Sequence, residues 1–356
     1  MINKSWSNLL LASGLFGIAA ALLYFFFQSL PVDGSSLGLD WQGIWLGLRG
    51  GLPRYGTGLR NPPWSLIPVF PLGLLSFRSS WAILTLATIG IEVIAVPREL
   101  TKRVYLLVTI FLVTSYPSLR TIADGNVEVL PIAGVLLTLF GYRTRRPWLM
   151  AIGLLVASAK PQETWLLIVI LALFVLRTWP LKRILPAALG ISVVLAVSMI
   201  LIGREWIDAL IGIEARGSIM DMSLLSSLAR LRLPPIVIWG IWITIFCITL
   251  YVTFATGSFV DHRKAGLLIT ASLLLAPYAA GNNLLVVASI GVMPLFISDL
   301  KTALALAILI DLPYLMLGQI SVVFWYGAYY GTVTLLLMWC VFAWKTRGST
   351  EYGLPA

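Results

Sequence analysis

The residues best suited to chemistry gather in four stretches, and the first lies early in the chain. It holds Asp33 and Asp40, followed by Tyr55, Arg60 and Asn61. A carboxylate beside a substrate hydroxyl can act as a general base. Asp40 is the preferred candidate, although it could also be a helix N-cap. Asp33 ranks second, because its Pro-Val-Asp-Gly context is well explained as a turn.

The second stretch, SLRTIADGNVEVL, contains Arg120, Asp124, Asn126 and Glu128. Asp-Gly-Asn is a common turn sequence, so a purely structural role for Asp124 and Asn126 is a fair alternative. Glu128 resists that interpretation because it lies one turn into an apolar segment. A carboxylate in such a place is costly and usually has a partner or a function.

The third and fourth stretches supply cations. Lys160 and Gln162 lie in a Lys-Pro-Gln break between two apolar segments, which favours a ligand-facing lysine over one that merely reaches the membrane surface. Arg216 and Asp221 lie in residues 213–235, whose 222–233 part predicts an amphipathic interfacial helix. Lysine and arginine hold phosphate groups. A carboxylate that acts as a general base can activate a sugar hydroxyl, and neighbouring apolar helices can hold a lipid tail. Together with the cations, these features predict a phosphate-linked polyprenyl sugar as substrate.

The elements that position these residues must be membrane helices. The chain has 356 residues, 59% hydrophobic and 11% charged, with mean hydropathy +0.93. Soluble domains carry about 25% charged residues, so a soluble enzyme, a disordered chain and a disulfide scaffold are all excluded. The apolar segments are 9–30, 63–77, 81–96, 104–119, 127–141, 147–159, 163–176, 184–202, 236–256, 265–280, 284–298, 302–318 and 321–344.

One of these segments is not expected to cross the membrane. Residues 62–77 carry Pro63, Pro68 and Pro71, which remove backbone donors and suit a re-entrant or short segment. Without it, about twelve transmembrane helices remain, within a range of about 11–13. Both termini and the basic loops then lie in the cytoplasm, as the positive-inside rule favours. The alternative, in which this segment crosses and a neighbouring short one does not, stays open.

The predicted architecture is all-α, a single integral membrane domain over residues 1–356. It divides into a catalytic-type module (1–202) with an external loop (31–80), a second external loop (203–234) and C-terminal helices (235–356). In the first loop, Trp41, Ile44, Trp45 and Leu48 follow helical spacing, which predicts a short amphipathic helix on the membrane surface.

Several other site types are disfavoured by composition. The net charge of +10 is assigned to cytoplasmic loops and not to a nucleic-acid partner. Cys247 and Cys340 lie in apolar stretches, and His262 is the only histidine. A His/Cys zinc site and a Ser-His-Asp triad are therefore not expected.

The order of these pieces resembles the GT-C glycosyltransferases, most closely glycosyltransferase family 87, the polyprenol-phosphate-mannose-dependent mannosyltransferase type. The resemblance covers roughly residues 10–300 and rests on four motifs. They are Asp40 in GLDWQGIW with Tyr55 and Asn61-Pro62-Pro63 after it, Asp124-Gly125-Asn126-Val127 opening a Leu-rich helix, Lys160-Pro161-Gln162, and Ala276-Pro277-Tyr278.

The resemblance implies a GT-C-like bundle in the plasma membrane with an extracytoplasmic active site. It would transfer mannose or another hexose from a polyprenyl-phosphate donor to a glycolipid, glycan or protein acceptor, by inverting displacement with Asp40 as general base. Lys160 and Arg216 would bind the donor phosphate, as would Arg120, which is assigned from charge and location alone. No cofactor is required, and no clustered carboxylate pair asks for the divalent metal that some GT-C enzymes use. The substrate-binding residues would be Tyr55, Arg60, Asn61, Asp124, Asn126, Glu128 and Gln162.

Two other classes of protein fit the sequence. A polytopic transporter or lipid-linked sugar flippase would use the intramembrane carboxylates Glu92, Glu128 and Asp311 to line a path. A non-catalytic membrane scaffold would need no such residues.

Overall fold

The computed structural model describes residues 4–50, 53–56, 59–211, 221–312 and 320–348. These ranges form helices joined by short connections, and no strand occurs within them. The α-helices are α1 (Lys4–Ser29), α2 (Leu39–Leu48), α3 (Phe77–Ala95), α4 (Lys102–Thr114), α5 (Tyr116–Asp124), α6 (Val129–Arg143), α7 (Pro147–Ala157), α8 (Pro161–Thr178), α9 (Leu181–Ile211), α10 (Leu224–Arg230), α11 (Pro235–Ala255), α12 (His262–Leu275), α13 (Leu284–Val287), α14 (Leu295–Ser298), α15 (Leu300–Asp311) and α16 (Ile320–Gly348).

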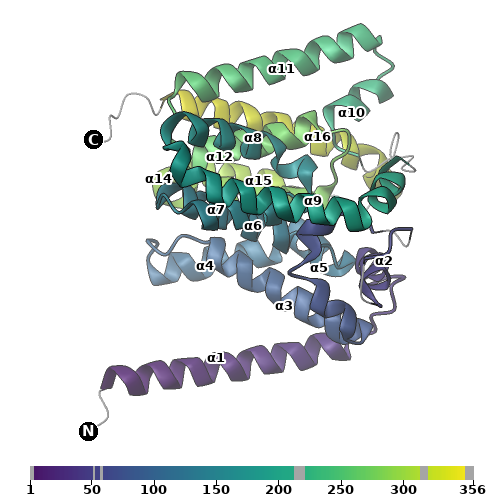
Figure 1. Cartoon of the computed structure of the whole chain (residues 1–356), viewed down its shortest axis with the longest axis vertical. Helices are drawn as coiled ribbons and strands as arrows, with labels where there is room; N and C mark the ends of the chain where they lie inside the picture. Colours follow the sequence, from purple (N-terminus) through teal and green to yellow (C-terminus); the bar gives the residue numbers. More distant parts are fainter. Residues whose placement is uncertain (1–3, 51–52, 57–58, 212–220, 313–319, 349–356) are drawn as a thin grey trace.

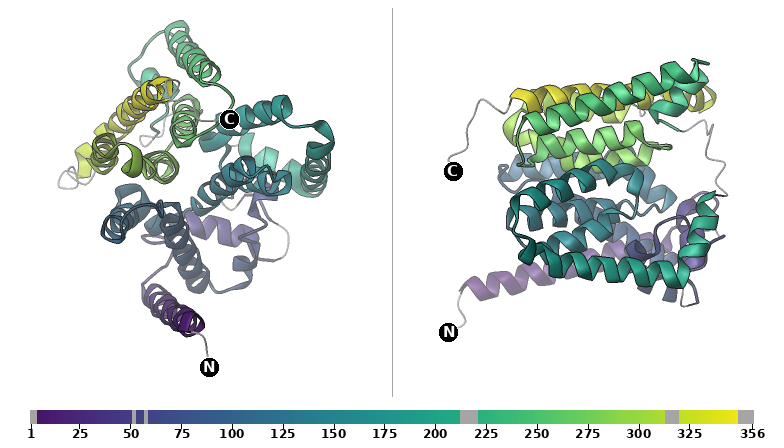
Figure 2. Two further views of the ribbon diagram at one scale, coloured as in Figure 1. Left: turned by 90° about the vertical axis from the view of Figure 1, so that its left-hand side faces the viewer. Right: turned by 45° about the horizontal axis from the view of Figure 1, so that its top comes forward.

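The longer helices run side by side as a bundle (Figures 1 and 2). α1 lies at one edge and packs against α3. The first residue of α1 and the last of α16 lie at the same end of the bundle, whereas α2 lies at the opposite end (Figure 1).

The apolar helices are those of a multi-pass membrane protein. Among the described residues, α3, α8, α9 and α11 are long and apolar enough to cross a bilayer, and the bent pair α4–α5, with a 49° break, is a fifth candidate. Helices α6 and α7 are apolar but shorter, with 15 and 11 residues. The predicted count of about twelve spans therefore stays a prediction.

The proline-rich stretch at 62–77 forms no long helix. It contains two short 3₁₀ helices, η1 (Pro63–Leu66) and η2 (Phe70–Leu74), before α3 begins at Phe77. Prolines at the start of each turn leave too few donors for a continuous α-helix. Every other apolar segment predicted from the sequence contains at least one helix.

Helix α2 occupies the stretch whose spacing predicted one. Its Trp41, Ile44 and Leu48 are buried against protein, and the Trp41 indole donates a hydrogen bond to Ser80 Oγ at 2.8 Å. The apolar face of α2 thus packs on α3, α5 and η2. Its contact with a membrane surface stays a prediction.

Helices α6 and α7 form the tightest pair in the fold, because glycines let their backbones touch. A Cβ on Gly134 would lie 2.1 Å from Ala157 N, and one on Gly141 would lie 2.4 Å from Met150 N. Glu128 directly precedes α6, and Lys160 follows α7. The close pair therefore brings the second and third sequence stretches to one place.

Candidate active site

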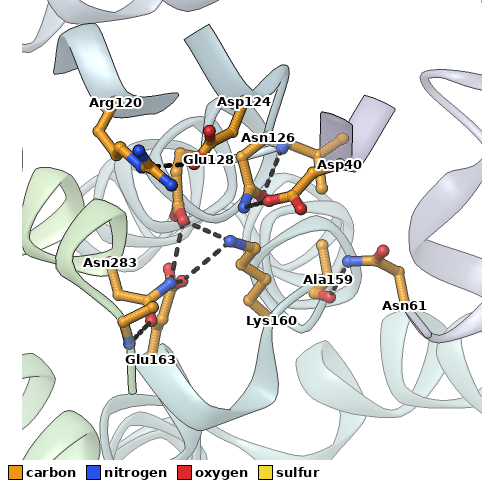
Figure 3. A network of polar contacts seen from close by, with 12 residues as sticks. Asp40, Asn61, Arg120, Asp124, Asn126, Glu128, Ala159, Lys160, Glu163 and Asn283 are labelled. Atoms are coloured by element: carbon orange, nitrogen blue, oxygen red, sulfur yellow. Dashed lines mark hydrogen bonds and ion pairs between the residues drawn. The ribbon is translucent and has the colours of Figure 1, made fainter. Parts of the chain in front are cut away.

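Four separate parts of the chain meet at the α2 end of the bundle (Figure 3). They are α2, the α5–α6 turn, the α7–α8 break, and η3 (Gly281–Asn283), which opens α13. They bring Asp40, Asn126, Glu128 and Lys160 together, although these residues span more than a hundred positions of sequence.

Asp40 is an exposed carboxylate held by one neighbour. Asn126 Nδ2 donates to Asp40 Oδ2 at 2.7 Å, while Asn126 Oδ1 accepts from Val127 N at 2.8 Å. The amide is thereby fixed in the orientation that donates to Asp40. In the described structure the second oxygen of Asp40 accepts no hydrogen bond from the protein, so it is available to a substrate hydroxyl.

Gly125 explains the Asp-Gly-Asn sequence in physical terms. It ends α5 in the left-handed conformation, with φ of 70°, and a Cβ there would lie 2.5 Å from Trp41 Cβ. Both the backbone angle and the close approach of α2 require glycine. The turn at Gly125 thus places the Asn126 side chain within hydrogen-bond distance of Asp40.

Lys160 is buried, 7% exposed, between two glutamates that are fully buried. Its ammonium is ion-paired with Glu128 Oε1 and lies 3.6 Å from Glu163 Oε1. Asn283 Nδ2 bridges the same two oxygens, donating at 3.0 Å to Glu128 and at 2.5 Å to Glu163. We call Glu128, Lys160, Glu163 and Asn283 the lysine cluster.

The charge state of Lys160 follows from these neighbours. Burial alone lowers the pKa of a lysine, but the charges of Glu128 and Glu163 outweigh it, so the pKa of Lys160 is raised above its usual value. The charge of Asp40 acts in the same direction. Lys160 is therefore a fixed cation next to the candidate base.

Of the two candidate phosphate-binding arginines, the structure describes only Arg120. Arg120 is exposed and pairs with Asp124, its Nε lying 2.7 Å from Asp124 Oδ2, at the edge of the same site (Figure 3). An exposed i,i+4 pair is weak and can exchange for a ligand phosphate. Arg216 lies outside the described residues.

Side-chain hydrogen bonds to backbone carbonyl oxygens hold the segment before η1 at the site. Tyr55 OH donates to Asn61 O at 2.7 Å, and Asn61 Nδ2 donates to the carbonyl of Ala159, next to Lys160, at 2.9 Å. Trp206 in α9 donates to Arg60 O at 3.0 Å. Burial raises the pKa of the Tyr55 phenol, and the charge of Glu205 adds to that effect. Gln162 is half-buried in the first turn of α8.

Asp33 belongs to a turn, as its sequence context suggested. Its Oδ1 accepts from Ser35 N and Ser35 Oγ, both at 2.8 Å, and from Ser36 N at 3.3 Å. These hydrogen bonds lower the pKa of Asp33. In the described ranges no hydrogen bond or ion pair links Asp33 to Asp40 or to the lysine cluster, so the structure does not bring the second candidate base into the network.

Three residues at this site were not singled out as site residues by the sequence. Glu163 and Asn283 belong to the lysine cluster, and Tyr278 lies where the charges of Asp221, Lys160, Asp40 and Arg60 all act on its phenol. Burial raises the pKa of Tyr278. Asp221 Oδ1 accepts from Ala279 N at 3.0 Å and so holds the Tyr278 segment. Among these, Tyr278 had a signal in the late Pro-Tyr pair.

Comparison with known proteins gives one match. The model of glycosyltransferase family 87 matches residues 60–277, more than half of the chain. No curated protein and no solved structure matches. The matched region contains Glu128, Lys160 and Glu163, whereas Asp40 precedes it and Asn283 follows it. Hydrogen bonds join both to the matched region, at 2.7 Å for Asp40 and at 3.0 and 2.5 Å for Asn283.

Proposed function

Because the chain belongs to glycosyltransferase family 87, we propose that it transfers mannose or another hexose from a polyprenyl-phosphate donor. The acceptor is a glycolipid, a glycan or a protein. The reaction takes place on the extracytoplasmic face of the plasma membrane, with both chain termini in the cytoplasm. The observation that carries the proposal is the meeting of an exposed carboxylate, Asp40, with a buried cation, Lys160, inside an apolar helical bundle.

The proposed reaction is a direct displacement at the anomeric carbon. Asp40 takes the proton of the acceptor hydroxyl, whose oxygen forms a bond to the anomeric carbon. The bond from that carbon to the donor phosphate oxygen breaks, and its electron pair leaves with the polyprenyl phosphate. Attack from the opposite face inverts the configuration. The free oxygen of Asp40 supports this role, since Asn126 occupies only Oδ2.

The charge released on the phosphate needs a cation, and the site offers several. Lys160 provides one fixed positive charge, and Arg120 provides a second at the edge of the site. Arg216 is proposed as a third. Preorganised cations of this kind stabilise a leaving group without reorganising during the reaction.

The remaining polar residues are proposed to shape the binding region. Tyr55, Arg60 and Asn61 belong to the segment tied to Ala159 and α9. Asp124, Asn126 and Gln162 belong to the turn and to the start of α8. The structure also brings Glu128 and Glu163 together as a buried carboxylate pair, which the sequence did not predict and which the Lys160 ammonium occupies.

The first test is the substitution Asp40→Asn in the purified protein. With polyprenyl-phosphate-mannose or -glucose and candidate glycolipid acceptors, the variant should lose about 10²–10⁴-fold in kcat, the range for a lost general base. Asp33→Asn should keep most of the activity, since Asp33 serves its own turn. Equal turnover by wild type and Asp40→Asn would remove Asp40 from the base role.

A transporter would behave differently. It would move a lipid-linked sugar across proteoliposomes in a manner that depends on Glu92, Glu128 and Asp311 and tolerates Asp40→Asn. Two of these carboxylates already serve local structure: Glu92 accepts from Ser118 Oγ and Asp311 accepts from Tyr116 N, both at 2.8 Å. These contacts support the enzyme over the transporter.

A further inference from the structure

The lysine cluster contains one more carboxyl group than it has cations. Lys160 is the one cation in contact with Glu128 and Glu163 in the described structure, and both glutamates are fully buried. Two ionised carboxylates would leave one buried negative charge uncompensated, which costs several kcal/mol in a protein interior. That charge would also repel a phosphate approaching Lys160.

The hydrogen bonds leave one oxygen of each glutamate without a partner. Both Oε1 atoms face Lys160 and Asn283, whereas Glu128 Oε2 and Glu163 Oε2 are buried and have no hydrogen-bond partner. The two carboxyl groups thus share both of their polar neighbours, Lys160 and Asn283. Asn283 draws them together with a single amide group, an arrangement that two like charges would resist.

We propose that Glu128 and Glu163 share one proton and act as positioning residues, so that the lysine cluster is neutral and holds the Lys160 ammonium toward Asp40. This inference rests on the proposed function for its catalytic consequence. Glu128 and Glu163 act through Lys160, and within the lysine cluster only Lys160 contacts the donor phosphate.

The geometry leaves Lys160 able to bind a ligand. An ammonium has three N–H donors. Glu128 accepts from one of them, Glu163 Oε1 lies 3.6 Å away without a hydrogen bond, and no other partner for Lys160 occurs among the described residues. Figure 3 shows the ammonium between the glutamates and the Asp40–Asn126 pair. An N–H donor that Glu128 does not occupy is therefore available to a ligand beside the Asp40–Asn126 pair.

The proposal predicts unequal effects of single and double substitutions. Glu128→Gln or Glu163→Gln leaves one carboxylate for one ammonium, so each variant keeps a neutral cluster. We expect the KM for polyprenyl-phosphate-mannose to stay within about threefold of wild type in either single variant. The double variant leaves a buried ammonium without a counter-charge, and its KM should rise more than about tenfold, with a smaller change in kcat.

Two further variants separate positioning from folding. Glu92→Gln removes a buried carboxylate that contacts Ser118 and not Lys160, and it should leave the donor KM unchanged. Adding Lys160→Met to the double variant removes the unpaired charge. It should restore the melting temperature in detergent but not the donor KM.

Each outcome has a defined meaning. If each single variant is as impaired as the double, both charges are needed and the shared proton is wrong. If the double variant has the wild-type donor KM and melting temperature, the cluster does not position Lys160. If wild type transfers no sugar, the proposed function fails, yet the melting temperatures of the two single variants, which should stay near that of wild type, still test the shared proton.

Discussion

At the scale of single residues, the candidate base depends on one amide. Asn126 donates to Asp40 Oδ2 and is itself fixed by Val127 N. A carboxylate on an exposed helix start would otherwise rotate freely. The hydrogen bond holds it in one orientation and leaves its second oxygen without a partner in the described structure, so we propose that Asn126 positions the base.

We therefore predict that Asn126→Ala lowers kcat by about tenfold, the effect of losing a hydrogen bond to a charged group. Because Asn126 acts through Asp40, the same change should have little further effect in an Asp40→Asn background. Gln42→Ala is the matched control, because Gln42 is an exposed amide on α2, the helix that carries Asp40. Additive losses in the double-mutant cycle would contradict this role.

At the scale of elements, the α6–α7 pair determines the distance between Glu128 and Lys160. Gly134 lets the backbone of α6 touch α7 at Ala157. Glu128 lies just before α6 and Lys160 just after α7. Any separation of the two helices moves the ammonium relative to its carboxylate partner.

The substitution Gly134→Ala tests this coupling. Its Cβ would meet Ala157 N at 2.1 Å, so the helices must part. We expect a loss of stability of about 1–3 kcal/mol and a raised donor KM. Gly90→Ala, in α3 with no atom within 4 Å of the new Cβ, should be neutral or slightly stabilising. Thermal unfolding in detergent and donor titration measure both effects, and a Gly134→Ala variant with wild-type values would contradict the coupling.

At the scale of the whole molecule, the candidate site lies at one end of the bundle, and the start of α1 and the end of α16 lie at the other. The start of α1 and the end of α16 lie together, and α2 lies away from them (Figure 1). For helices that cross a membrane, this arrangement would place α2 on the side of the bilayer opposite the start of α1 and the end of α16.

Cysteine labelling tests that separation in intact cells. After Cys247 and Cys340 are replaced, Leu39→Cys, at an exposed position beside Asp40, should react with a membrane-impermeant maleimide added outside. Arg145→Cys, exposed in the α6–α7 turn, should react only after permeabilisation. The reverse pattern would place the site in the cytoplasm.

The sequence by itself determined the class of fold and the positions of most helices. Its apolar content left no fold but a membrane bundle, and runs such as 184–202 and 236–256 became α9 and α11. It also singled out Asp40, Asn126 and Lys160, which the structure brings together, since a charged or amide group is conspicuous beside apolar segments. How many helices cross the bilayer depends on how they tilt and pack, so composition alone left that count as a prediction.

Only the tertiary structure decided how these residues pair. Glu163 looked like an ordinary acidic residue in the first turn of a helix, and Asn283 looked like part of a turn. Glu163 lies only three residues from Lys160, but Asn283 joins the cluster only where η3 meets α8, which local sequence does not encode. Helix formation follows from interactions between near neighbours along the chain, whereas Lys160 meets Glu128 across 32 residues and Asn283 meets Glu163 across 120.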